Sequence, residues 1–392
     1  MTAPSPTLTA RNAVAISFAL NGLLFATWVS RIPEVREGLG LSNGGLGVLL
    51  LALASGSVLS LPTTGALINR FGTVRVVRFG GASAAVGLLL AGLGAGVGSV
   101  VAVTAVGLFC YGVGTGVWDV SMNVEGAAVE HGLGRTIMPR FHAGFSLGTV
   151  AGAGIGALVV ALGVPMMVHL SVLGVAALVV SWRTSGAFLP VDPEPEGRRP
   201  ASSAWREPRT LLIGMMVLAL ALTEGTANDW LALALVDGYD VERWVGVAGF
   251  AVFVTAMTAG RLTGPVLLDR FGRPAVLWAT MATAAVGILL IVFGGSTLPV
   301  VVGIVLWGLG ASLGFPVGMS AAADDPVQAA ARVSVVSTLG YAAFLAGPPL
   351  LGLVADEVGT LRALLVVAVL LLPSALVVPA ARQRGATSGA AT

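Results

Sequence analysis

Carboxylate and amide side chains occur in pairs inside long apolar stretches of this 392-residue chain. Glu224 is followed four positions later by Asn228, and Asp119 is followed in the same way by Asn123. Residues four apart share one face of an α-helix, so each acid would lie beside an amide. A carboxylate can exchange a proton, and an amide both donates and accepts hydrogen bonds. The two pairs therefore predict sites that combine proton exchange with recognition of a polar molecule.

Polar groups at such positions are costly, because an ionised side chain at the centre of a membrane helix costs about 2.5–3.5 kcal/mol. Glu224 has no basic neighbour in the interior of its stretch, which favours a functional role. Asp119 has the alternative of being neutralised by Arg140 or Arg261. Asn21, central in the first apolar stretch, has the alternative of tying two helices together by hydrogen bonds.

The elements that carry these residues are predicted to be membrane-spanning helices. The chain is 56% hydrophobic and 10% charged, with a mean hydropathy of +0.93, whereas soluble proteins are about 25% charged. A spanning helix needs about 20 mostly apolar residues. Twelve segments satisfy this length: 12–30, 43–68, 76–96, 99–128, 139–162, 165–182, 209–236, 244–268, 275–295, 298–320, 333–355 and 361–380.

The same composition excludes several other classes of protein. Disorder requires low hydrophobicity, and the one cysteine, Cys110, excludes a disulfide scaffold. The net charge of +2 is too small for a nucleic-acid binder. All 21 basic residues are Arg, so no phosphate-binding loop with its Lys exists to drive ATP-powered pumping. The three His residues are scattered, and we expect no enzymatic activity, no metal and no cofactor.

The arginines predict the orientation in the membrane, because cytoplasmic loops are enriched in them. With a cytoplasmic N-terminus, sixteen arginines fall inside and four, Arg31, Arg36, Arg243 and Arg362, fall outside. Arg261 lies within the eighth span. We therefore expect a multi-pass protein of the cytoplasmic (inner) membrane with both termini in the cytoplasm.

An internal duplication divides the chain into two halves. A proline-rich polar segment separates six spans from six, which predicts halves 1–183 and 209–392 joined by a cytoplasmic linker, 184–208. Arg70-Phe71-Gly72 recurs as Arg270-Phe271-Gly272, 200 positions later. The pattern Gly107, Tyr111, Gly112, Gly114 recurs 196 positions later as Gly303, Trp307, Gly308, Gly310.

This arrangement resembles the major facilitator superfamily, whose signature turn between spans two and three reads roughly G-x-x-x-D-R-x-G-R. The first copy here has Asn69 in place of the acid, and the second has Pro265 in place of the first Gly. Segments 118–126 (WDVSMNVEG) and 138–148 (MPRFHAGFSLG) resemble the MosC-like branch, which is associated with rhizopine, an inositol-amine compound. The resemblance implies an all-α integral membrane fold of twelve helices in two pseudo-symmetric six-helix halves.

The resemblance also implies roles for particular residues. Spans one, four, seven and ten would line the cavity, which makes the expected substrate-binding residues Asn21, Asp119, Asn123, Glu224, Asn228 and Trp307. Glu224 would carry the coupled proton, with Asp119 and His142 as a second titratable pair. The gate would use Asn69, Arg70, Gly72, Arg75, Arg140, Asp269, Arg270, Gly272, Arg273 and Arg332. Because Asn69 cannot ionise, we expect the ion pairing that closes the cytoplasmic gate to be weaker in the N-terminal half. The alternative role of the gate arginines is to anchor the turns at anionic headgroups.

Together these features predict a secondary transporter that works by alternating access. The expected substrate is a small polar metabolite (a sugar, polyol or amine derivative), moved by proton symport or antiport across the lipid bilayer by a monomer. The alternatives are an exporter of hydrophobic drugs or secondary metabolites and a membrane sensor that does not transport.

Overall fold

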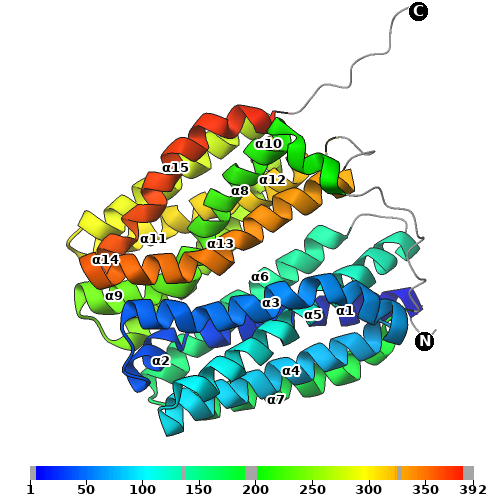
Figure 1. Ribbon diagram of the computed structural model, residues 1–392, viewed down its shortest axis with the longest axis horizontal. Helices are drawn as coiled ribbons and strands as arrows, with labels where there is room; N and C mark the ends of the chain where they lie inside the picture. Colours follow the sequence, from blue (N-terminus) through cyan, green and yellow to red (C-terminus); the bar gives the residue numbers. More distant parts are fainter. Residues whose placement is uncertain (1–5, 134–136, 190–200, 323, 325–328, 383–392) are drawn as a thin grey trace, which may run out of the picture. The chain divides into compact units, whose positions relative to one another are not determined.

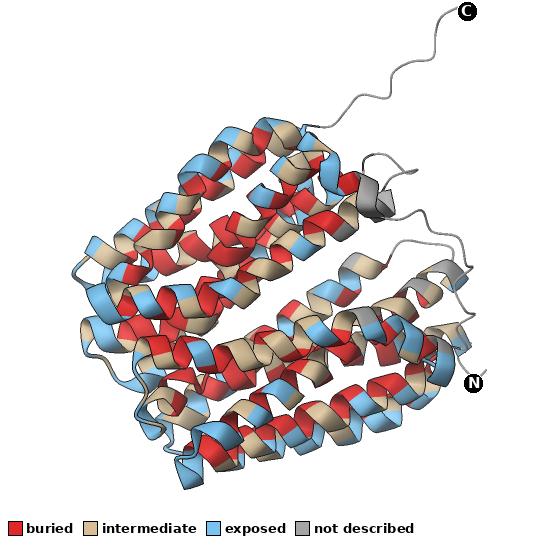
Figure 2. Cartoon of the chain, viewed as in Figure 1, coloured by how far each residue is buried: buried red, intermediate tan, exposed pale blue. Residues whose placement is uncertain are grey.

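The computed structural model describes residues 6–133, 137–189, 201–322, 324 and 329–382. Throughout these ranges the regular structure is helical, and no strand is assigned. A search of the same ranges finds eleven helices long and apolar enough to cross a membrane. Large apolar side chains remain exposed on many of them, Leu376 at 81% and Leu298 at 74%, as expected for surfaces that face lipid. Figure 2 shows exposed and buried positions alternating along the helices.

The longest helix, α10 (Arg243–Phe293), contains two membrane passes. Its 51 residues would extend about 77 Å at 1.5 Å per residue, more than twice the roughly 30 Å of a hydrocarbon core. Gly272 interrupts the helical backbone with φ 74° and ψ 161°, a region open almost only to glycine. The eleven long helices therefore supply twelve spans. Gly72 has nearly the same backbone angles, φ 79° and ψ 157°, at the end of α3 (Asn43–Phe71).

Contacts divide the chain into two compact units. Unit 1 comprises residues 1–196, 228–254 and 348–361, and unit 2 comprises 197–227, 255–347 and 362–392. This grouping differs from a division at the linker, because unit 1 also contains residues 228–254 and 348–361 from the second half of the chain. Each unit is described by itself below.

Unit 1 is built around helices from the first half of the chain. They are α1 (Pro6–Val29), α2 (Ile32–Gly38), α3, α4 (Thr73–Leu93), α5 (Val101–Leu133), α6 (Met138–Ala161) and α7 (Met166–Thr184). Helix α4 packs on α5 and α7, α3 packs on α5, and α1 packs on α6 (Figure 1). The indole Nε1 of the fully buried Trp118 donates a 2.6 Å hydrogen bond to Ser17 Oγ, which ties α5 to α1. Helix α9 (Ala232–Tyr239) also belongs to this unit and contacts α2.

Unit 2 is organised around α8 (Pro208–Thr226). This helix packs against α11 (Thr297–Ala311), α12 (Gly314–Ala322) and α15 (Leu365–Val377). The remaining helices of the second half are α13 (Ala329–Val358) and α14 (Thr360–Ala363). A small apolar cluster of Ala221, Leu222 and Ala343 joins α8 to α13.

The packing confirms the internal duplication. In unit 1, a Cβ added to Gly87 would lie 2.4 Å from the backbone nitrogen of Tyr111. In unit 2, a Cβ added to Gly287 would lie 2.5 Å from the backbone nitrogen of Trp307. Glycine in each place lets two helices approach at the same point of the repeat.

Two spans of the second half depart from regular α-helix near their centres. The α8 span passes through a π-helical segment, Ala227–Leu231, before α9, and the tenth span breaks between α11 and α12. A π segment changes the helical register, so residues after Leu231 are rotated relative to Glu224 by more than a regular helix would predict. Nothing in the composition of this stretch marks the π turn.

Candidate substrate and coupling site

A half-buried ion pair lies beside these departures from regular helix. Nη2 of Arg261 donates to both carboxylate oxygens of Glu224, each at 2.9 Å. The Glu224 side chain is 17% exposed and that of Arg261 is 26% exposed. Glu224 lies 16 residues after the start of α8 and 15 before the end of α9, about 24 and 22 Å along the helix, which places it at mid-span. Sequence reasoning singled out both residues but considered Arg261 only as a partner for Asp119.

The helix break beside this pair supplies a further contact. Arg261 Nε donates to the carbonyl oxygen of Ser312 at 3.3 Å, and Ser312 lies between α11 and α12. A broken helix exposes carbonyl groups that an intact helix would use internally. One arginine therefore joins the end of α8, the first pass of α10 and the break in the tenth span. Discontinuous helices of this kind form the binding sites of many secondary transporters.

A second acid and amide lie together in unit 1, on α5. Asn123 Nδ2 donates to the carbonyl oxygen of Asp119 at 2.9 Å and to its Oδ1 at 3.3 Å. Both residues are half-buried. These two bonds fix the orientation of the Asn123 amide relative to Asp119.

Three further candidates are buried. Asn21 is 5% exposed and Asn228 is 7% exposed, and within the described residues Asn21 Nδ2 and Asn228 Oδ1 have no hydrogen-bond partner. An unsatisfied buried polar group costs about 1–3 kcal/mol, so each such atom can gain from a ligand or water. Trp307 is 0% exposed and offers no surface to a ligand in this state. His142 is exposed and packs edge-on against Phe18 with ring centroids 5.0 Å apart.

The expected gate residues occupy the turns after α3 and in α10. The guanidinium groups of Arg70 and Arg270 lie over the rings of Phe71 and Phe271, at 5.3 and 5.2 Å from the ring centroids. Asp269 is exposed. The remaining members, Arg75 and Arg140, are exposed as well, and the side chain of Asn69 lies outside the described residues.

The acid that pairs with the turn after the eighth span is Asp324. Arg273 Nη1 contacts Asp324 Oδ1 at 2.6 Å, and Arg209 Nη2 contacts Asp324 Oδ2 at 2.9 Å. The three side chains are 10–16% exposed. Arg332 pairs instead with Glu207, at 2.6 Å. Sequence reasoning missed both acids, although Asp324 belongs to the one acidic pair between spans ten and eleven.

A second ionic cluster, here called the clasp, lies at the end of unit 1 where α2 meets α9. Arg36 donates to both oxygens of Asp237 at 2.6 Å and to Asn43 Oδ1 at 2.8 Å. Asp356 accepts from the backbone N–H groups of Asn43 and Gly44 at 2.8 and 2.9 Å, at the first turn of α3. Thr360 Oγ1 also donates to Asp237, at 3.2 Å. The clasp joins residues some 200 to 310 positions apart, and sequence reasoning counted Arg36 only as a loop arginine.

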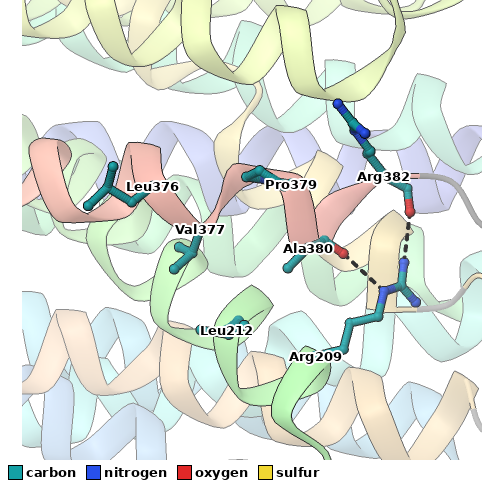
Figure 3. Close-up of a pocket in the computed structure, with 7 residues that line it drawn as sticks. All are labelled: Arg209, Leu212, Leu376, Val377, Pro379, Ala380 and Arg382. Atoms are coloured by element: carbon teal, nitrogen blue, oxygen red, sulfur yellow. Dashed lines mark hydrogen bonds between the residues drawn. The ribbon is translucent and has the colours of Figure 1, made fainter.

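A pocket of about 520 Å³ lies elsewhere, at the start of α8. Arg209 donates there to the carbonyl oxygens of Ala380 and Arg382, at 2.9 and 3.0 Å (Figure 3). Apolar side chains form the rest of its wall. Arg209 and Glu224 are 15 residues apart on one helix, about 22 Å, so this pocket is separate from the ion pair.

Comparisons with known proteins agree with this geometry. The sequence profile described as Major Facilitator Superfamily matches residues 244–390. An uncharacterized transporter of Sinorhizobium fredii is 35% identical over 91% of this chain and 93% of its own length. An uncharacterized MFS-type transporter of Yersinia pestis is 31% identical over 90% and 91%. Membrane protein MosC of Rhizobium meliloti is 30% identical over 90% of this chain and 85% of its own.

Solved structures show the same fold at low sequence identity. The nucleoside transporter NupG, in a D323A mutant, superposes with a TM-score of 0.79 at 14% identity, over 95% of this chain and 99% of that one. A bacterial homologue of the human lysosomal transporter Spinster gives 0.72 at 12% identity, over 98% and 100%. The twelve spans, the duplication and these relatives define a multi-pass membrane transporter. The chain belongs to the major facilitator superfamily and is similar to MosC.

Proposed function

We propose that this protein is a proton-coupled secondary transporter of a small polar metabolite, with Glu224 as its coupling residue. The observation that carries the proposal is the mid-span ion pair of Glu224 and Arg261, placed beside two departures from regular helix. A buried pair is weak evidence for stability, since apolar residues of similar volume often serve as well. Its placement favours a functional role.

The mechanism follows from the charges. Protonation of Glu224 removes the ionic attraction between its carboxylate and Arg261. The guanidinium group can then donate to another acceptor. The ion pair reforms when the proton leaves. Proton binding thereby changes which partner Arg261 holds, and the site can couple that change to alternating access. Asp119 with Asn123, and the buried amides of Asn21 and Asn228, supply hydrogen bonds that suit a polar substrate better than an apolar drug.

Two groups of charged residues supply the proposed gates. On the cytoplasmic side, the turns at Gly72 and Gly272 act with the Asp324 cluster, Arg332 and Arg140. On the outer side, the clasp supplies the gate. We further propose that the protein works as a monomer in the cytoplasmic membrane, with both termini inside and with halves 1–183 and 209–392 joined by the linker 184–208.

Transport by purified protein in proteoliposomes tests the proposal. Glu224→Gln abolishes substrate movement driven by a pH gradient but retains exchange of substrate between the two sides, because exchange needs no net proton transfer. Glu357→Gln, at the exposed end of α13, is the matched control and transports normally. Full gradient-driven transport by Glu224→Gln would refute the role of this residue.

A further variant separates coupling from folding. Arg261→Gln alone leaves Glu224 buried without its counter-ion, which is expected to destabilise the protein. In Glu224→Gln/Arg261→Gln neither charge remains, and stability is expected to recover. A stable double variant without gradient-driven transport supports the coupling role.

A further inference from the structure

We propose that the substrate is a ring-bearing monocarboxylate, held by Arg261 through its carboxylate and by an aromatic wall through its ring. The aromatic wall is Phe315, Tyr341 and Phe344. This inference rests on the proposed function and names the substrate class of the same site. The proposed function requires a small polar metabolite, and this inference adds that the metabolite carries one negative charge and one ring.

The free edge of Arg261 is the first observation. Its Nε faces the Ser312 carbonyl and its Nη2 holds both oxygens of Glu224. Within the described residues, no hydrogen-bond partner is recorded for Nη1, and a quarter of the side chain is exposed. A guanidinium presents its donors as a planar fork that matches a carboxylate. When Glu224 is protonated, Nη1 and Nη2 are both available to one carboxylate.

The aromatic wall is the second observation. The Phe315 and Tyr341 ring centroids are 6.4 Å apart, and those of Tyr341 and Phe344 are also 6.4 Å apart. All three residues are only half-buried. Their exposed faces can pack on a ring, whether aromatic or a saturated sugar ring.

Residues of the aromatic wall lie close to residues that neighbour the ion pair. Phe344 approaches Gly225 so closely that an added Cβ there would lie 3.1 Å from its ring, and Gly225 directly follows Glu224. Phe315 lies three residues after Ser312, whose carbonyl accepts from Arg261. One end of the wall therefore packs on the residue after Glu224, and the other end lies three residues from the carbonyl group that Arg261 contacts.

Charge balance gives the reason for a single negative charge. Arg261 and Glu224 sum to zero when the site is empty. A proton alone leaves one uncompensated positive charge, and an anion alone leaves one negative charge. A proton together with a monoanion restores zero. An uncompensated charge is costly within the membrane. Binding of the proton together with the monoanion is therefore favoured over binding of either one alone, and this preference couples their transport.

Few charged side chains lie near Glu224, and Asp229, five residues further along the same span, is the acid next to it in the chain. Helices α11, α12 and α15, which pack on α8, contain no Asp, Glu, His, Lys or Arg. Helix α13 carries its charged residues only near its ends, at Arg332, Asp356 and Glu357. Its titratable residue beside the site is Tyr341. Among the described residues, Arg261 is the ion-pair partner of Glu224, so the charge on Glu224 responds first to Arg261 and to what binds there.

Proteoliposomes with an internal pH indicator test the substrate class. The probes are D-glucuronate (ring and carboxylate), D-glucose (ring alone), D-gluconate (carboxylate without a ring), and the aromatic pair nicotinate and nicotinamide, with protein-free vesicles as the control for leakage. A gradient of glucuronate or nicotinate is expected to drive proton movement at least tenfold faster than its neutral counterpart. Gluconate is expected to require a higher concentration.

Variants assign the parts of the site. Arg261→Lys keeps the charge but loses the planar fork, and is expected to raise KM for the carboxylates tenfold or more. Phe344→Leu is expected to raise KM for glucuronate or nicotinate while leaving that for gluconate within twofold. Coupled transport of glucose or nicotinamide, but of no carboxylate, would overturn the substrate class and leave the proposed function standing. Absence of coupled proton movement with every probe would count against both.

Discussion

Loosening the clasp should shift the conformational equilibrium of the protein toward a state open at the α2–α9 end. The perturbation is Asp237→Asn, which keeps the size of the side chain and removes its charge. Asp237 accepts two hydrogen bonds from Arg36 and one from Thr360. An amide presents only one oxygen, so one bond from Arg36 is lost and the other loses its ionic character.

The magnitude follows from bond type and exposure. A hydrogen bond to a charged group contributes about 1.5–3 kcal/mol where buried, and an exposed ion pair contributes about 0–1 kcal/mol. Arg36 and Asp237 are 22% and 25% exposed, which places the loss between these limits, at about 1–2 kcal/mol. A change of that size shifts an equilibrium by a factor of about 5–30.

Distance measurement between two spin labels reports this shift. Leu41→Cys and Val241→Cys place labels in the loops after α2 and α9, in a Cys110→Ala background that removes the chain's single cysteine. Asp237→Asn is expected to increase the population with a long distance between the labels. The matched control is Arg243→Gln, which breaks the pair with Glu37, whose side chains are 44% and 61% exposed. That control is expected to change the populations less than twofold.

The outcome decides whether the clasp holds this end closed. Unchanged label distances in Asp237→Asn would refute the reasoning, and so would an equal shift in Arg243→Gln, because exposure would then not determine the contribution of each pair. High salt is expected to reproduce part of the Asp237→Asn effect in the unmodified clasp, since it screens partly exposed charges.

Two further predictions concern the turns. Asp324→Asn leaves Arg209 and Arg273 without their counter-charge and should lower the unfolding free energy by about 2 kcal/mol. Asp269→Asn, at an exposed position, should change the unfolding free energy by less than about 0.5 kcal/mol. Thermal unfolding in detergent measures both variants, and equal effects would contradict the Asp324 pairing. Gly272→Ala should destabilise by about 1–3 kcal/mol because its backbone angles are open almost only to glycine. The control is Gly154→Ala, in the helical part of α6 with open space around its Cβ position, which should be neutral or stabilising by up to about 1 kcal/mol. A similar loss of unfolding free energy in both variants would exclude the backbone angles of Gly272 as the cause.

The repeat was visible in the sequence because its physical causes are local. A turn that needs φ near +75° and ψ near 160° selects glycine in both copies, at Gly72 and Gly272. A close helix approach selects small residues at Gly87 and Gly287. Such constraints act on single positions, so they leave the same residue at matching points of both halves.

The partners of the charged residues were not visible in this way. Glu224 and Arg261 are 37 positions apart on different helices, and Arg36 and Asp237 are 201 apart. Which acid meets which arginine depends on how far each helix is rotated and shifted against its neighbours. The π segment at Ala227–Leu231 alters that rotation within one span, and no local composition signals it.

The sequence by itself determined that this chain crosses the membrane twelve times in two related halves, since hydropathy and turn geometry act residue by residue. It also picked out Glu224, because an ionisable group within an apolar span is conspicuous wherever the helices pack. Only the tertiary structure decided that Arg261 neutralises it, that Asp324 rather than Asp269 lies between Arg209 and Arg273, and that Asp237 and Asp356 close the clasp. Ion pairs form between side chains that packing brings within about 3 Å, and packing is a property of the whole set of helices.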